Sequence, residues 1–213
     1  GNGAVYVTDD FVVLDGLVAV TDTGAVGNRG LIQDISNGTQ VRNCVLDVQH
    51  STTWPLQCNN GGQSANCVYE NNVCKVIGTQ SALAFYASGA VTVGIDLNNN
   101  TLWRDPAGGA YRALFFQALT GGQLTVNARN NFIFGVDNWS TGNTSGGGTL
   151  TMTGAGNFID VVGSNMGAGV AAMEGTTTTN PAASSTGSRA IYDATTGALL
   201  NVAGNDAVGV GTA

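Results

Sequence analysis

The sequence predicts an all-β chain in which short strands form coils stacked on one another. Three observations support this prediction: a related segment recurs along the chain, apolar residues alternate within it, and each segment carries a Gly or Asn where the chain can turn. The turn positions are separated by 27, 29, 28, 31 and 26 residues, a loose period of about 28. These positions are Gly16, Asn43, Asn72, Asn100, Asn131 and Asn157.

The segments are apolar runs on either side of the turn residue, and they cover residues 11–17, 41–46, 68–74, 95–102, 126–133 and 152–159. The fourth shows the pattern best, because Val91, Val93, Ile95 and Leu97 alternate with polar or small residues, which is typical of a strand buried on one face. Asn tolerates the left-handed region better than other residues except Gly, so it can turn the chain into the next strand. Stacked Asn side chains are then expected to form a hydrogen-bonded ladder, made of Asn43, Asn72, Asn100, Asn131 and Asn157.

A second landmark keeps the same period. The triplet Gly61–Gln63 recurs as Gly121–Gln123 at a similar distance before its Asn, and an Ala-flanked apolar run at 82–87 recurs at 113–118 and 190–194. Two landmarks in register make a chance repeat a poor explanation.

Composition excludes several classes of protein. The chain has 213 residues, a net charge of −7 and only 7 Lys and Arg, which do not cluster, so no nucleic-acid surface is expected. No stretch approaches the roughly 18 apolar residues of a membrane span. With 43% hydrophobic and 10% charged residues, we expect a single folded domain with a sizeable core.

The turn Asn residues and their flanking strands resemble those of the right-handed parallel β-helix family, to which pectate-lyase-like enzymes and many phage tailspikes belong. The resemblance rests on Asn72, Asn100, Asn131 and Asn157 and extends more weakly to the segments around Gly16 and Asn43. It implies a single-stranded right-handed parallel β-helix of about six coils over residues 1–165. The alternative is a β-sandwich, which also has many short strands, although its strands do not repeat one internal motif.

The C-terminal fifth has a different composition. Residues 166–213 are rich in Gly, Thr and Ser and have few large apolar residues, which predicts an irregular, loop-rich segment. Apolar runs at 189–192 and 198–202 indicate a final partial coil or a closing strand pair.

Four cysteines lie within 31 residues: Cys44, Cys58, Cys67 and Cys74. Their spacings of 14, 9 and 7 lack the close pair that structural zinc sites generally use, so we expect no metal. Two readings stay open. The four cysteines are either candidate disulfide cysteines, with Cys58 and Cys67 closing one loop, or small buried thiols inside the coils.

The resemblance implies that any catalytic residues would be acidic and basic side chains on the outward face of the coils. Aligned on the turn Asn, Glu70, Asp96 and Arg129 fall on one outward face and are the strongest catalytic candidates, as acid or base and metal-binding carboxylates. The set is sparse, and the only histidine, His50, has no catalytic context. A solvated polar face is therefore the favoured interpretation, and an enzyme is not predicted.

The expected function is that of a rigid, non-enzymatic structural or attachment module of a phage virion, such as a tail fibre, tailspike or capsid decoration protein. No cofactor is expected. The expected partners are other copies of the chain, with a trimer implied by the resemblance, and other virion or surface proteins, at an extracellular or virion-surface location. Exposed aromatic residues could stack on a glycan: Trp54, Trp103, Tyr111, Phe134 and Trp139. The alternatives are a secreted polysaccharide lyase or hydrolase and a bacterial extracellular adhesin.

Overall fold

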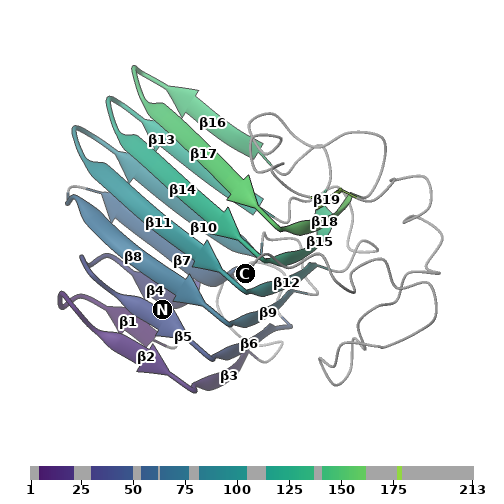
Figure 1. The fold of residues 1–213 in the computed structure, drawn as a ribbon. Coiled ribbons are helices and arrows are strands. Elements are labelled where there is room, and N and C mark those ends of the chain that lie inside the picture. The colour runs from purple at the N-terminus through teal and green to yellow at the C-terminus, as the bar shows by residue number, and fades with distance from the viewer. Residues whose placement is uncertain are drawn as a thin grey trace.

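The computed structural model describes residues 5–21, 30–49, 54–61, 63–76, 82–104, 114–136, 141–161 and 177–178. Within these ranges every regular element is a β-strand, and the strands stack in parallel as a β-solenoid (Figure 1). The predicted fold class is therefore confirmed. No helix long and apolar enough to cross a membrane occurs in the part of the chain that the structure describes.

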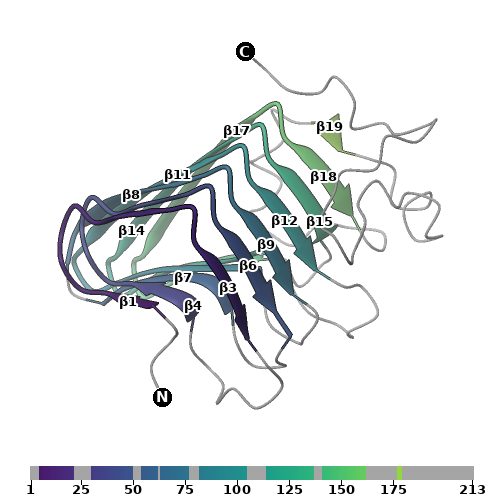
Figure 2. The ribbon, with the colours of Figure 1, turned by 90° about the horizontal axis from the view of Figure 1, so that it is seen from below.

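Three parallel sheets form the sides of the solenoid, and Figure 2 shows them in a view along the stack. Sheet A contains β1 (Val5–Val7), β4 (Gly30–Asp34), β7 (Trp54–Gly61), β10 (Leu83–Ser88), β13 (Leu114–Leu119) and β16 (Thr141–Ser145). Sheet B contains β2 (Val13–Asp15), β5 (Gln40–Arg42), β8 (Ala65–Glu70), β11 (Thr92–Asn98), β14 (Gln123–Arg129) and β17 (Thr149–Ala155). Sheet C contains β3 (Val18–Thr21), β6 (Val45–Val48), β9 (Val73–Val76), β12 (Thr101–Arg104), β15 (Phe132–Val136), β18 (Phe158–Val161) and β19 (Thr177–Thr178).

The solenoid is regular over part of its length only. In sheet B, β8 has six residues and β11, β14 and β17 have seven each, whereas β2 and β5 have three. The regular part thus has about four turns, slightly fewer than the six predicted coils. The first two turns repeat the motif, but their sheet B strands have only three residues.

Alternation of apolar residues places the core inside the three sheets. In β11, Val93, Ile95 and Leu97 are buried, and the residues between them face outward. Aromatic rings stack from turn to turn in sheet A, where Phe85 lies over Phe116 with ring centroids 5.6 Å apart. Parallel pairing in exact register makes this possible, because equivalent side chains lie one strand spacing apart, about 4.8 Å.

At the corner between sheets B and C, the structure corrects the predicted place of Asn43 in the asparagine ladder. Asn43 has a φ of 55° and is exposed, like Asn71 and Asn99 at φ 54° and 55° in the next two turns. The ladder Asn is the following residue of each turn, and in the turn of Asn43 that position holds Cys44. Asn43 is therefore a left-handed corner residue and not a ladder residue, because only the second position of each pair points into the core.

The predicted C-terminal segment 166–213 lies outside the described residues except for 177–178. Those two residues form β19, which pairs in parallel with β18.

Candidate functional site

Buried asparagines form a ladder along the interior corner between sheets B and C. The Asn72 side-chain amide donates to Val41 O at 2.8 Å and to Asn100 Oδ1 at 3.0 Å, while its backbone N–H donates to the same Oδ1 at 3.0 Å. Asn100 makes the equivalent three bonds to Tyr69 O and Asn131 Oδ1. The series runs through Asn72, Asn100, Asn131 and Asn157, and each of these is at most 1% exposed.

Cys44 occupies the N-terminal position of the ladder. Its backbone N–H donates to Asn72 Oδ1 at 3.0 Å, and its thiol donates to Arg42 O at 3.2 Å. Every ladder amide thus has partners in the dry interior, where an unpaired polar group is costly. This arrangement holds turns in register, which is a structural role.

The outward face of sheet B carries the three catalytic candidates. Glu70 and Arg129 lie in one row across the sheet, with Asn98 between them, and Asp96 lies in the neighbouring row on the same face. Since two strand spacings separate Glu70 from Arg129, their backbones are about 10 Å apart. No ion pair joins the three candidates, although the described part of the chain contains ion pairs elsewhere.

Glu70 and Asp96 each have a more direct neighbour than the other catalytic candidates. Glu70 is paired in register with Arg42, whose guanidinium lies 2.9 Å from Asp15 Oδ2. Asp96 Oδ1 accepts a hydrogen bond of 3.1 Å from Asn127, which in turn accepts one of 2.7 Å from Thr153. Hydrogen bonds from Asn43 and Arg42 lower the pKa of Asp15 below its ordinary value.

A shallow depression of about 320 Å³ lies over this face, lined in part by Asp96, Asn66 and Asn127. Gly94 is also part of the lining, and the Asn66 carboxamide lies where a side chain at Gly94 would be. The lining offers one carboxylate among neutral amides and hydroxyls, so the depression lacks the closely spaced acid and base that glycoside hydrolysis requires.

The aromatic candidates do not form an exposed platform in the described residues. Trp54 and Trp103 are partly buried, and the Lys75 ammonium lies 5.8 Å from the centroid of the Trp103 ring. His50, Tyr111, Trp139 and the side chain of Phe134 lie outside the described residues.

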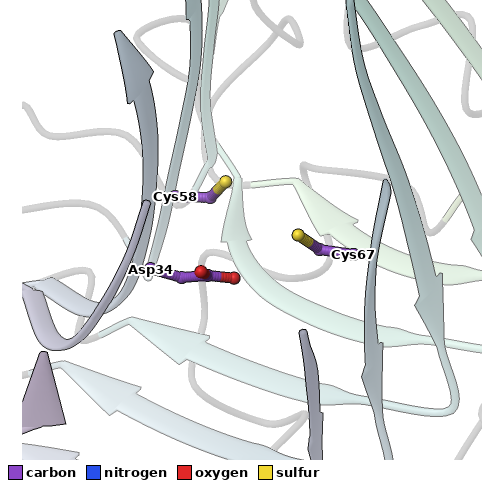
Figure 3. Close-up of side chains that lie close together, drawn as sticks. All are labelled: Asp34, Cys58 and Cys67. Atoms are coloured by element: carbon purple, nitrogen blue, oxygen red, sulfur yellow. The ribbon is translucent and has the colours of Figure 1, made fainter. Parts of the chain in front are cut away.

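The four cysteines are free, buried thiols, and burial raises the pKa of Cys44 and of Cys74. Cys58 and Cys67 form a cluster with Asp34, a residue that the sequence analysis does not single out. One ligand atom from each of the three lies within 4.8 Å of the others (Figure 3). The neighbouring Cys67 thiol, together with burial, raises the pKa of Cys58.

Asp34 is fully buried, and four hydrogen bonds hold its carboxylate. Oδ1 accepts from the Ser36 N–H at 2.9 Å, the Ser36 hydroxyl at 2.7 Å and the Thr39 hydroxyl at 3.2 Å. Oδ2 accepts from the Tyr69 hydroxyl at 3.0 Å. The topology explains why sequence spacing misses this cluster: parallel pairing of β4 with β7 places Asp34 beside Cys58, 24 residues further along the chain.

Stacked parallel strands, an interior amide ladder and a polar outer face define a parallel β-solenoid protein. No protein-family model matches the chain, and neither the curated proteins nor the solved structures give a significant match. The assignment to this class therefore rests on the architecture described above.

Proposed function

We propose that the protein is a rigid, non-enzymatic structural or attachment module of an extracellular assembly, of the kind that phage tail fibres, tailspikes and decoration proteins provide. The observation that carries the proposal is the apolar N-terminal edge of the solenoid. We define this edge as the exposed large hydrophobic residues of the described chain, all of which lie in the first two turns: Tyr6, Phe11, Val13, Val18, Val20 and Val45.

The edge combines apolar side chains with open hydrogen-bonding groups. Val18 is 68% exposed and Val20 is 58% exposed, and both lie on β3, the terminal strand of sheet C. Among the described strands, β1, β2 and β3 each pair on one side only. A free strand edge presents N–H and C=O groups that another strand complements, and exposed apolar residues beside it favour burial in an interface.

The occupant we propose for this edge is a second copy of the same chain, in a homo-oligomer for which the trimeric phage β-helices are the precedent. Homo-oligomers dominate among soluble assemblies, and identical subunits present matching strand spacing. The outward Thr and Asn residues of sheet B would then stay available to a glycan or protein partner at the virion surface.

The enzymatic alternative has weaker support. Cleavage of a polysaccharide by a two-carboxylate mechanism needs an acid and a base on either side of the scissile bond. The outward face of sheet B supplies Asp96 without a second carboxylate in its row. The other described positions of that row hold Val13, Gln40, Val68, Asn127 and Thr153.

Light scattering over a range of concentrations tests the proposal. The wild-type chain is expected to assemble, and Val18→Lys combined with Val20→Lys is expected to shift it to monomer. Thr149→Lys combined with Thr151→Lys, a matched pair of exposed positions on β17, should leave assembly unchanged. Equal masses for wild type and the edge variant would contradict a homotypic edge.

A screen against acidic polysaccharides on the same samples tests the absence of activity. No cleavage is expected from the wild-type chain. Cleavage that Asp96→Ala or Glu70→Ala abolishes would overturn the proposal in favour of the enzyme.

A further inference from the structure

We propose that Asp34, Cys58 and Cys67 form an interior binding site for a thiophilic divalent cation, of which Zn²⁺ is the representative. The three side chains come from β4, β7 and β8 and converge inside the solenoid (Figure 3). Their ligand atoms lie within 4.8 Å of one another, and the residues are 0%, 0% and 2% exposed. This inference concerns the interior and does not depend on the proposed attachment role.

The neighbouring turns show how much space separates the two thiols. In the next turn Phe85 occupies the position of Cys58, and Ile95 occupies that of Cys67. In the turn after that, Phe116 and Val126 fill the same pair of positions. The gap between the sheets therefore accommodates an aromatic ring facing a branched aliphatic side chain, whereas each cysteine extends only one heavy atom beyond Cβ.

This spacing favours a bridging ion over a disulfide. A disulfide draws the two Cβ atoms to about 3.5–4.5 Å and the sulfurs to about 2.05 Å. Two thiolates on one tetrahedral Zn²⁺, with Zn–S distances of about 2.3 Å, lie roughly 3.7 Å apart. The observed limit of 4.8 Å between ligand atoms is compatible with such a triangle after small side-chain adjustments.

The Tyr69 ring fills the space beside the thiols and stacks on Phe85 with ring centroids 5.1 Å apart. Its hydroxyl hydrogen-bonds Asp34 Oδ2, which places it to complete the ligand set or to orient the carboxylate. Donors from Ser36 and Thr39 fix Oδ1. Surrounding donors that orient the ligands in this way are typical of metal sites.

Charge supports the same inference. Asp34 is completely buried, and the ion pairs that the structure describes join other carboxylates, Asp15 and Asp47, to their cations. Buried carboxylates are usually paired with a cation or coordinate a metal. A divalent ion would neutralise Asp34 and allow both thiols to bind as thiolates, with their protons released to solvent.

Because the cluster is closed to solvent, the ion is expected to enter as the chain folds. The test is therefore refolding of the reduced, full-length chain with Co²⁺, followed by displacement with Zn²⁺. We expect one Co²⁺ per chain, thiolate-to-cobalt charge transfer in the near ultraviolet and the visible bands of a tetrahedral ion. Removal of the ion with a chelator before refolding should lower the midpoint of thermal unfolding.

Variants separate a site from adventitious binding. Cys58→Ser and Cys67→Ser are expected to abolish the charge-transfer band, and Asp34→Asn is expected to weaken binding by at least about tenfold. Cys74→Ser is the matched control, since Cys74 is equally buried and lies outside the cluster.

The wild-type chain decides the question even if a cluster variant fails to fold. Failure of the reduced wild-type protein to take up Co²⁺ or Zn²⁺ on refolding would overturn the proposal. A Cys58–Cys67 disulfide in peptide maps of the purified, unreduced protein, with no metal uptake after reduction, would overturn it in favour of a covalent link. A charge-transfer band that persists in Cys58→Ser and Cys67→Ser would also contradict it.

Discussion

At the level of single residues, the two asparagines of a corner dipeptide have different roles: the first turns the chain, and the second joins neighbouring turns by hydrogen bonds. Asn99 has a φ of 55° and is exposed, so its contribution is conformational. Asn100 is 1% exposed and bonds to the turns on both sides. The pair Asn71 and Asn72 repeats this division one turn earlier.

Replacing Asn100 by Ala is expected to destabilise the fold strongly. The Asn72 backbone N–H and Tyr69 O lose their partner in the dry interior. Each buried group left unpaired costs about 1–3 kcal/mol. Chemical denaturation measures the loss, with Asn99→Gly as the control that should be close to neutral because Gly accepts a positive φ. Similar free energies of unfolding for the two variants would contradict a role for the ladder.

Asp15 provides a residue-level prediction about pH. Hydrogen bonds from Asn43 and Arg42 lower its pKa in the folded protein below the ordinary value of 3.8. A lowered folded pKa means that these bonds favour folding above pH 3.8 and lose that effect as the pH falls through the folded pKa.

Carboxyl NMR titration checks this prediction for Asp15. We expect Asn43→Ala and Arg42→Gln each to raise the pKa of Asp15 toward 3.8, with the larger shift for the Asn43 variant because its bond contributes most. A wild-type pKa at or above 3.8 would contradict the geometry.

The sequence predicts the ladder to within one residue, and the exception has a physical cause. In three of the six turns two asparagines are adjacent, so the spacing alone cannot decide which Asn turns the chain and which points inward. At Asn43 the left-handed corner takes the one Asn present and Cys44 fills the inward position, whereas in the last turn Gly156 takes the corner at φ 63° and leaves Asn157 inward. Gly16 follows the same rule in the first turn, with a φ of 73°.

At the level of elements, the corners between sheets A and B depend on glycine. The corner after β16 contains Gly146 and Gly147 at φ 55° and 80°, followed by Gly148. A Cβ on Gly148 would lie 2.2 Å from Ala118 O and 2.4 Å from its carbonyl carbon, both in the backbone of β13. Close stacking of successive corners therefore requires the third glycine for space rather than for its φ.

Gly148→Ala is expected to lower stability more than Gly147→Ala. The first change forces two backbones apart, and overpacking of this kind costs roughly 1–3 kcal/mol or more. The second change meets open space and carries only the left-handed penalty, about 1–2 kcal/mol. Denaturation of both variants ranks them, and the reverse order would show that the corners separate without cost.

Strands are the elements that the sequence predicts best, because burial on one face imposes a period of two that residues 91–97 and 124–128 display. The thiol cluster is beyond such reasoning. Asp34 meets Cys58 only through the register of β4 with β7, and Cys67 reaches them from the facing sheet. For Glu70 the sequence suggests a neighbour that the structure does not provide. The strand register places Arg42 beside Glu70, and Arg129 lies two strands away.

At the level of the whole molecule, the solenoid changes character along its axis. The interior positions that hold Phe85 and Phe116 in the middle turns hold Cys58 and then Asp34 toward the N-terminus. The strands of sheet B shorten in the same direction, and the exposed hydrophobic residues collect there. Apolar packing and hydrogen bonding both weaken toward the apolar N-terminal edge.

Stacked repeats contact only their neighbours, so local stability should follow this gradient. We expect amide hydrogen exchange to be slowest in β11 and β14, where seven-residue strands pair on both sides, and fastest in β2 and β3. Mass spectrometry of the exchanging chain measures the profile. Assembly through the apolar N-terminal edge should slow exchange in β2 and β3 selectively at high protein concentration, whereas Val18→Lys with Val20→Lys should remove that concentration dependence. Uniform protection from β2 to β17 would contradict the gradient, because it would mean that the short N-terminal turns are as stable as the regular ones.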